Sequence, residues 1–156
     1  ELKSNLDSDI VSVGVFVDAN LEEIIELYDE GIIEIAQLHG TESEEYINVL
    51  KERTNNELKI IKAIVMSQDN DLSYYDDLDV DYLLLDSGKG SGKTFDWRLI
   101  SHDFKKEFFL AGGINSTNVV EAIERFNPYA IDLSSSLETD GFKDENKIKE
   151  IMEVIS

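Results

Sequence analysis

The sequence lacks cysteine altogether and contains a single proline, Pro128. Without cysteine the chain has no disulfide framework, no thiolate metal site and no thiolate nucleophile. No run of about 18 uncharged apolar residues occurs either, so the sequence predicts no membrane-spanning helix and no membrane partner. We recognise no signal peptide, which favours a cytoplasmic location.

Basic residues are also scarce. The chain has 14 Lys and Arg against 34 Asp and Glu, and its formal net charge is −20. Binding of nucleic acid needs a basic face that neutralises phosphates, so this charge argues against a nucleic-acid partner. The 156 residues are 42% hydrophobic, which is enough for one buried core. With no linker or low-complexity tract in the chain, we expect residues 1–156 to form a single domain.

Apolar runs alternate with amphipathic stretches along the chain. The runs are nearly continuous in hydrophobicity, as in strands buried on both faces of a parallel sheet; they cover Val11–Val17, Ile33–Leu38, Leu58–Val65, Val80–Leu85, Phe108–Ala111 and Ala130–Leu133. We expect helices over Leu21–Glu30, Glu42–Arg53, Asp69–Asp79, Phe95–Phe104, Asn118–Phe126 and Lys143–Ile155. The repeated βα unit predicts an α/β fold with right-handed crossovers.

Two architectures use such units. An open doubly wound sheet needs about five or six strands, whereas a closed (βα)8 barrel needs eight units and about 200–250 residues. Six units in 156 residues fit the open sheet better, but counting alone does not decide between the two. In both architectures, functional sites form at the carboxyl ends of the strands.

A glycine-rich segment, Leu83–Thr94, follows one predicted strand. Its end, Gly92–Thr94, is similar to a phosphate-binding P-loop, but Ser87 stands where that pattern has its first glycine. A P-loop nucleotide binder in an open sheet is therefore one hypothesis, and a solvated loop is another. Asp86, at the end of the strand, is either a carboxylate that accepts hydrogen bonds from turn amides or a catalytic acid or base.

Two further strands end in glycine or serine. Gly112 and Gly113 would let a phosphate approach the backbone at a helix N-terminus, although a tight turn with positive φ explains them equally well. Ser134, Ser135 and Ser136 offer hydroxyls that hydrogen-bond phosphate oxygens or cap a short helix. Because the loops after the last two strands of a barrel frequently form a phosphate site, the two segments together are more specific than either alone.

The remaining polar residues give weaker signals. His39 also ends a predicted strand, but a lone histidine is more often structural than catalytic. His102 is distant in the sequence, so we expect no metal site. Trp97 is expected to pack in the core. The acidic runs Glu42–Glu45 and Asp76–Asp81 are expected to be solvated.

Five strings of the sequence resemble the phosphoribosylanthranilate isomerase family, barrel enzymes of tryptophan biosynthesis. In the family's order and spacing they are VGVFVDAN, AQLHGTES, LLLDSGKGSGKTFDW, LAGGINSTNV and IDLSSSLETDGFKDENKI, and they span almost the whole chain, from about Val11 to Ile148. The resemblance implies a TIM barrel of the (βα)8 type, of which this chain covers about six units, the third to the eighth.

The resemblance also implies a reaction without a cofactor. It is the Amadori rearrangement of N-(5′-phosphoribosyl)anthranilate, a small phosphorylated substrate, to 1-(2-carboxyphenylamino)-1-deoxyribulose 5-phosphate. An acid opens the furanose ring to a Schiff base, and a base removes the C2′ proton. By resemblance Asp86 is the general acid, Gly112, Gly113, Ser134 and Ser135 bind the phosphate, and His39 and Asp132 face the substrate. Ser136 replaces the glycine that is usual in the family.

One departure from the family is larger. Its general base is a cysteine on the first strand, and an arginine follows the second strand; neither has a counterpart here. The chain also opens at Glu1, and its first methionine is Met66. We therefore expect the first two βα units, roughly 45 residues, to be absent from this sequence, and the chain alone to be inactive.

Such a truncation would leave two strand edges open, at Val11–Val17 and Ala130–Leu133. Open edges pair with other chains, so we expect self-association or a complementing N-terminal segment there. The alternative to an enzyme is a non-catalytic binder of phosphorylated ligands or a scaffold fragment, because the phosphate loops are present with only half of the acid–base pair.

Overall fold

The computed structural model describes residues 7–88 and 95–156. These residues form two compact units. Unit 1 holds residues 7–63 and 74–83, and unit 2 holds residues 64–73, 84–88 and 95–156. The P-loop-like residues Gly92–Thr94 lie outside the described residues, and the expectation of a single domain stays a prediction.

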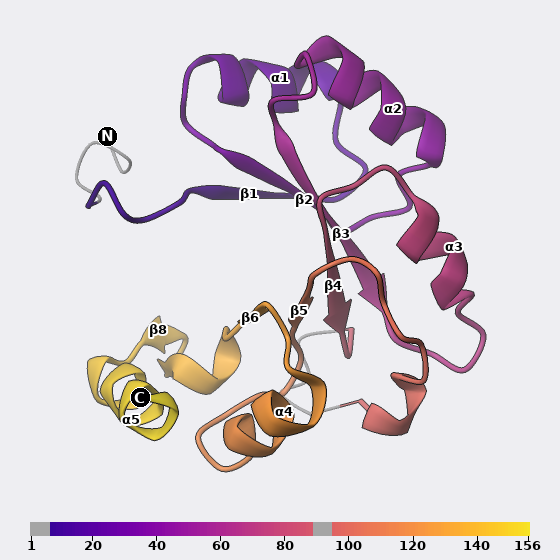
Figure 1. Ribbon diagram of the computed structural model, residues 1–156. Helices are drawn as coiled ribbons and strands as arrows, with labels where there is room; N and C mark the ends of the chain where they lie inside the picture. Colours follow the sequence, from indigo (N-terminus) through magenta and orange to yellow (C-terminus); the bar gives the residue numbers. More distant parts are fainter. Residues whose placement is uncertain (1–6, 89–94) are drawn as a thin grey trace. The chain divides into compact units, whose positions relative to one another are not determined.

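Unit 1 is a parallel sheet with helices on one face. Strands β1 (Val13–Phe16), β2 (Ile35–Leu38) and β3 (Lys59–Val65) pair in register, with Val13 opposite Ile35 and Ile35 opposite Lys59. Helices α1 (Leu21–Asp29) and α2 (Glu44–Arg53) contact each other and cover the same face of these strands (Figure 1).

Helix α1 begins at the predicted residue, Leu21, and α2 begins at Glu44, two residues after the predicted start at Glu42. The Asn20 side chain accepts a hydrogen bond from the backbone N–H of Glu22 at 3.0 Å, and Ser43 accepts one from Tyr46 N at 3.2 Å. These caps satisfy backbone donors that a helix leaves unpaired at its first turn. The apolar stripes are buried: Ile24, Ile47 and Leu50 are fully inaccessible to solvent.

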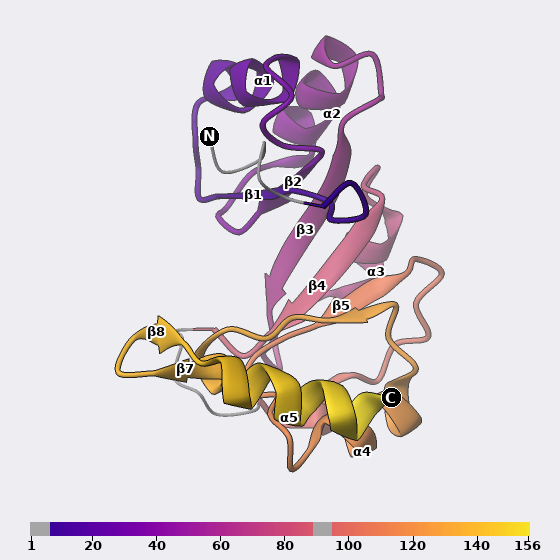
Figure 2. The same cartoon turned by 90° about the vertical axis from the view of Figure 1, so that its left-hand side faces the viewer.

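Unit 2 contains the second half of the chain, and β3, α3 (Leu72–Asp77) and β4 (Tyr82–Asp86) contribute residues to both units. Its other strands and helices are β5 (Phe108–Leu110), α4 (Val119–Phe126), β6 (Ala130–Ile131) and α5 (Glu145–Ile155), with short 3-10 turns at Trp97–Leu99 and Ser135–Leu137. Helices α4 and α5 contact each other, and the small hairpin β7 (Glu138–Thr139) and β8 (Phe142–Lys143) lies beside the start of α5 (Figure 2).

The order of the strands distinguishes the two architectures that the sequence leaves open. In unit 1 the order is β1, β2, β3, β4, and in unit 2 it continues through β3, β4, β5 and β6. Each strand therefore neighbours the strands adjacent to it in sequence, as in a barrel. A doubly wound sheet instead reverses its order at a switch point. The six predicted strands are confirmed, with shorter bounds.

The predicted helix over Phe95–Phe104 is wrong. Only Trp97–Leu99 forms a 3-10 turn, which Asp96 caps by accepting a hydrogen bond from Arg98 N at 3.0 Å. Aromatic packing takes the place of helical hydrogen bonds: the Trp97 ring meets Phe126 edge to face with centroids 5.7 Å apart. The three- and four-residue spacing of apolar residues thus reflects packing of an irregular segment. Trp97 is only half-buried, so the prediction that it packs in the core is not confirmed.

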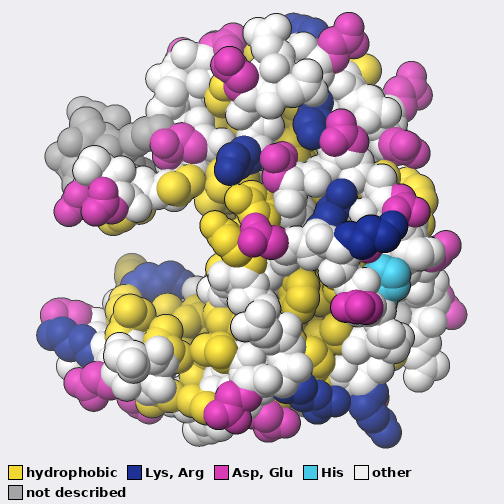
Figure 3. All heavy atoms as spheres, in the orientation of Figure 1, with side chains coloured by type: hydrophobic (Ala, Val, Ile, Leu, Met, Phe, Trp, Pro, Cys, Tyr) yellow, Lys and Arg dark blue, Asp and Glu magenta, His cyan; other side chains and the backbone are white. Residues whose placement is uncertain are grey.

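Strand β1 also differs from the prediction of burial on both faces. Among the described ranges its one neighbouring strand is β2. Val13, Val15 and Val17 alternate along it and are 42%, 61% and 66% exposed. Figure 3 shows hydrophobic side chains at the surface over β1 and, in the other unit, over α5.

The hairpin of β7 and β8 is missing from the predicted elements, although the sequence carries its signal. Asp140 and Gly141 connect the two strands with φ values of 52° and 82°. Asp-Gly is the pair of residues that a two-residue hairpin turn with two positive φ angles favours. No helix within residues 7–88 or 95–156 has the length and apolarity needed to cross a membrane.

Candidate functional site

Three strand ends meet at the carboxyl edge of the sheet in unit 2. Ala111 N donates to Leu85 O at 2.9 Å, and Asp132 N donates to Leu110 O at 2.9 Å. These two bonds align the ends of β4, β5 and β6 side by side. Asp86 and Gly112, which follow paired residues, and Asp132, which is itself paired, therefore lie at one edge of the sheet.

The loops after β4 and β5 are in close contact. Gly112 has a φ of +78°, and a Cβ atom built on it would lie 2.5 Å from Ser87 N and 2.6 Å from Ser87 Cβ. An L side chain would therefore clash with the residue that directly follows Asp86. The glycine thus places the backbone after β5 directly against the loop that carries the predicted acid.

A hydrogen-bonded turn follows the two glycines. Gly113 also has a positive φ, 71°, and its carbonyl accepts hydrogen bonds from the side-chain amides of Asn115 and Asn118, each at 3.1 Å. Asn118 Oδ1 in turn accepts from Asn115 N at 2.9 Å. Two asparagines therefore hold the peptide after Gly113 in one orientation at the start of α4.

The serine segment after β6 forms the third loop of this edge. Ser134 and Ser135 are exposed, and the Ser134 carbonyl accepts a hydrogen bond from Lys143 Nζ at 3.0 Å. Lys143 also pairs with Glu138 at 2.7 Å, so the hairpin after the serines is tied to the loop. Ser136 Oγ is buried and has no hydrogen-bond partner among the described residues.

His39 lies in unit 1, at the carboxyl end of β2. Its backbone N–H donates to Phe16 O at 2.7 Å, which extends the ladder between β1 and β2 by one residue. Its ring atom Nδ1 lies 3.2 Å from Gln37 Nε2, and Gln37 is buried. The Gln37 amide therefore fixes the position of the imidazole ring from the strand side.

Two acidic residues of unit 1 that had no predicted role, Glu42 and Asp76, are buried. Glu42 belongs to an acidic run that is expected from sequence to be solvated, yet its side chain is only 1% exposed and forms an ion pair with Lys62 on β3. Asp76 in the other acidic run is also buried, at 3% exposure. Sequence shows no signal for the burial of Glu42, because its partner is 20 residues away.

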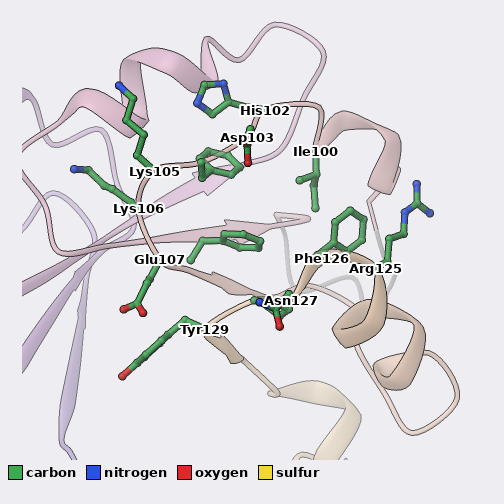
Figure 4. Close-up of a pocket in the computed structure, with 13 residues that line it drawn as sticks. Ile100, His102, Asp103, Lys105, Lys106, Glu107, Arg125, Phe126, Asn127 and Tyr129 are labelled. Atoms are coloured by element: carbon green, nitrogen blue, oxygen red, sulfur yellow. The ribbon is translucent and has the colours of Figure 1, made fainter.

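A cavity of about 530 Å³ in unit 2 contains none of the predicted site residues. It is lined by the segment before β5 and by the end of α4, so it lies at the amino ends of the strands. Lys105 and Arg125 extend to opposite sides of it (Figure 4). Its charged groups do not converge on a common point, and we do not assign it a function.

Comparison with known proteins decides the family. The family model of N-(5′-phosphoribosyl)anthranilate isomerase matches residues 2–154. The chain belongs to this family. The isomerase of Endomicrobium trichonymphae is 42% identical over 98% of this chain and 76% of its own length, and that of Clostridium acetobutylicum is 39% identical over 97% and 76%.

Solved structures of the family agree with the fold. The phosphoribosylanthranilate isomerase of Thermus thermophilus superposes with a TM-score of 0.83 at 30% identity, over 99% of this chain and 76% of that one. A family structure in complex with reduced 1-(o-carboxyphenylamino)-1-deoxyribulose 5-phosphate has a TM-score of 0.81 at 32% identity, over 97% and 74%. The predicted α/β class and the family resemblance are therefore confirmed.

Proposed function

We propose that the protein is a phosphoribosylanthranilate isomerase of tryptophan biosynthesis and that the edge formed by β4, β5 and β6 binds and protonates its substrate. The observation that carries this proposal is the alignment of Asp86, Gly112 and Asp132 by the bonds Ala111–Leu85 and Leu110–Asp132. This alignment brings a half-buried carboxyl group next to a glycine turn and a serine loop, within a chain of this family.

Asp86 acts as the general acid in this proposal. Its carboxyl group donates a proton to the furanose ring oxygen while the C1′–O bond breaks and the amine lone pair forms the C=N bond of a Schiff base. Asp86 must carry a proton when substrate binds, and the negative phosphate and carboxylate of the substrate favour that protonated form. Loss of the C2′ proton to a base then gives the enolamine, which tautomerises to the ketose.

The phosphate is bound by the next two loops. Gly112 and Gly113 add no side chain of their own over their backbone N–H groups, and the chain continues from them into helix α4. An anion binds favourably to backbone N–H groups at a helix N-terminus. Ser134 and Ser135 are exposed and add hydroxyl donors. Asp132, on the same edge, is a further proposed substrate contact, and the family resemblance proposes His39 of unit 1 as another. The negative net charge of the chain, −20, makes such local donors necessary for holding an anion.

The substitution Asp86→Asn tests the acid. Because a positioned general acid contributes about 10²–10⁴-fold, we expect kcat of the full-length protein, which includes the base, to fall by about that factor with little change in KM, measured by chromatography of the product. Asp29→Asn, an exposed residue at the end of α1, is the matched control and should keep full activity. Unchanged turnover in Asp86→Asn would show that another group protonates the ring.

The alternative function, a non-catalytic binder of phosphorylated ligands, is tested by calorimetry together with the turnover assay. Calorimetric titration of the wild-type protein with a phosphorylated sugar would then release heat while no product forms. Product formation by the wild type excludes this alternative.

The base is the part of the mechanism that these 156 residues do not supply, since the family resemblance assigns it to a cysteine and the sequence has none. We propose that further βα units carrying this base pair with the edge of β1 that has no neighbouring strand among the described residues. Such units would also cover the exposed side chains of Val13, Val15 and Val17. The intact mass of the native protein tests this. A mass several kilodaltons above 17.7 kDa supports it, whereas 17.7 kDa together with full activity contradicts it.

A further inference from the structure

We propose that Glu42 and Lys62 are a positioning pair that holds the loop after β2 in one conformation and thereby sets the His39 side chain for substrate. The inference rests on the proposed function, since it concerns a substrate contact of that reaction. The pair lies wholly in unit 1: Glu42 is in the loop after β2, and Lys62 on β3 lies opposite Leu38, the last residue of β2.

The Glu42 carboxylate has a full set of hydrogen-bond donors around it. It accepts from Asp18 N at 2.9 Å, from Gly40 N at 3.1 and 3.0 Å, and from Lys62 Nζ at 2.6 Å. Its side chain is 1% exposed and that of Lys62 is 5% exposed. A buried charge is tolerated only when it is paired and hydrogen-bonded in this way.

Together the two side chains form hydrogen bonds with both the backbone N–H and the carbonyl of Gly40. Lys62 Nζ donates to the Gly40 carbonyl at 2.8 Å, while Glu42 accepts from the Gly40 N–H. Gly40 directly follows His39 in the chain. Rotation of the backbone at this position would break hydrogen bonds to two buried charges at once, so the conformation next to His39 is strongly restricted.

A second contact holds the same loop against the loop after β1. Asp18 Oδ1 accepts from Thr41 N at 2.6 Å and from Thr41 Oγ1 at 3.0 Å. A Cβ atom on Gly40 would lie 2.5 Å from Asp18 Oδ1 and 2.7 Å from Asp18 N. The loop therefore packs as closely as a glycine permits, with Glu42 bonded to Asp18 N across the same contact.

The imidazole ring itself is oriented from the strand side. Gln37 is buried on β2 and its amide lies 3.2 Å from His39 Nδ1. The amide holds the ring, whereas the ion pair holds the backbone from which the ring projects. Both are needed for the imidazole to keep one position.

The chemistry of the pair favours a positioning role over a role in stability alone. Replacing a buried ion pair by well-packed apolar residues is often neutral or stabilising, so such a pair is a poor source of stability. Hydrophobic residues at these positions would fill the same volume but would leave the Gly40 peptide and Asp18 N without partners. What the ion pair adds is a single loop conformation.

A double-mutant cycle in kcat/KM tests the inference on the full-length protein. Because a displacement of about 1 Å can cost roughly 10²-fold, we expect Glu42→Gln to lower kcat/KM by about 10- to 100-fold, and His39→Asn to lower it at least as much. If Glu42 acts through His39, the double variant is no worse than His39→Asn, because the interaction is already lost. Circular dichroism at the assay temperature confirms that each variant is folded.

The matched control breaks a different ion pair of unit 1. Lys51 Nζ lies 2.8 Å from Asp79, whose side chain is 67% exposed. Lys51→Met should leave kcat and KM unchanged. Losses from Glu42→Gln and His39→Asn that multiply in the double variant would overturn the inference, as would a folded Glu42→Gln variant with kcat/KM within about twofold of the wild type.

Lys62→Met keeps the inference falsifiable if Glu42→Gln does not fold. It removes the hydrogen bond to the Gly40 carbonyl and leaves the buried Glu42 carboxylate without its cation. Burial then favours protonation of Glu42. We expect kcat/KM of this variant to fall more steeply than that of the wild type between about pH 8 and pH 5. Parallel pH profiles, or an unchanged value, would overturn the inference.

Turnover by the full-length wild-type protein, with the base-carrying βα units present, is measured first and tests the proposed function separately. Its absence overturns both the proposed function and the inference. Turnover in the wild type that His39→Asn does not alter leaves the isomerase in place and overturns the inference alone.

Discussion

Replacing Gly112 by alanine tests the close contact between the two loops that carry Asp86 and the glycine turn. The new Cβ would lie 2.5 Å from Ser87 N and would also meet Ser87 Oγ, on a backbone with φ +78°. The left-handed conformation costs an L residue about 1–2 kcal/mol, and overpacking costs about 1–3 kcal/mol. We therefore expect the free energy of unfolding to fall by about 2–5 kcal/mol.

Gly141→Ala is the control that separates these two contributions. Gly141 has a φ of +82°, but no atom lies within 4 Å of the position that a Cβ would take there. It should lose only the conformational part, about 1–2 kcal/mol. Urea unfolding followed by circular dichroism gives both values with comparable slopes. Equal losses in the two variants would refute the clash with Ser87.

Activity gives an independent reading of the same substitution. Since the clash moves the loop after β5 away from Ser87, the phosphate site and Asp86 separate. We expect Gly112→Ala to raise KM and to lower kcat in the fraction that remains folded, whereas Gly141→Ala leaves both nearly unchanged. A Gly112→Ala variant with wild-type kinetics would mean that the spacing of these loops does not matter for the reaction.

Two further predictions concern buried polar groups. Ser136 Oγ is buried without a partner among the described residues, so Ser136→Ala should raise the free energy of unfolding by about 1 kcal/mol in urea; a loss of stability would indicate a bound water there. Burial raises the pKa of Glu42, but hydrogen bonds from Lys62 and from backbone N–H groups outweigh it and hold the pKa below 4.5. Its contribution to stability is therefore present above about pH 4.5 and is lost as the pH falls through the lowered value, so the thermal unfolding curve of Glu42→Gln should depend less on pH in that range; identical slopes would contradict this.

The local elements of this protein follow from its sequence because their causes are local. Apolar periodicity and capping residues such as Asn20 and Ser43 act within one or two helical turns, so α1 and α2 were predicted within about two residues of their bounds. The strand-end residues were predicted for a similar reason: Asp86 and Gly112 directly follow apolar runs. The hairpin at Asp140 and Gly141 was predictable in the same way.

Other features depend on partners that are distant in the sequence. Phe95–Phe104 has helical spacing, but Trp97 packs on Phe126 instead of continuing a helix. Nothing near Glu42 in the chain indicates that Lys62 will neutralise it, so an acidic run looks solvated although its first member is buried.

The sequence by itself determined the α/β class, the family and the identity of the residues at the strand ends, because strings of adjacent residues carry that information. The tertiary structure decided which strands are neighbours and that Gly112 lies against Ser87. It also decided that Glu42 and Lys62 form hydrogen bonds with the backbone of Gly40. These contacts join segments about 20 or more residues apart, and their energies depend on burial and on hydrogen-bond geometry that arise only when the sheet has formed.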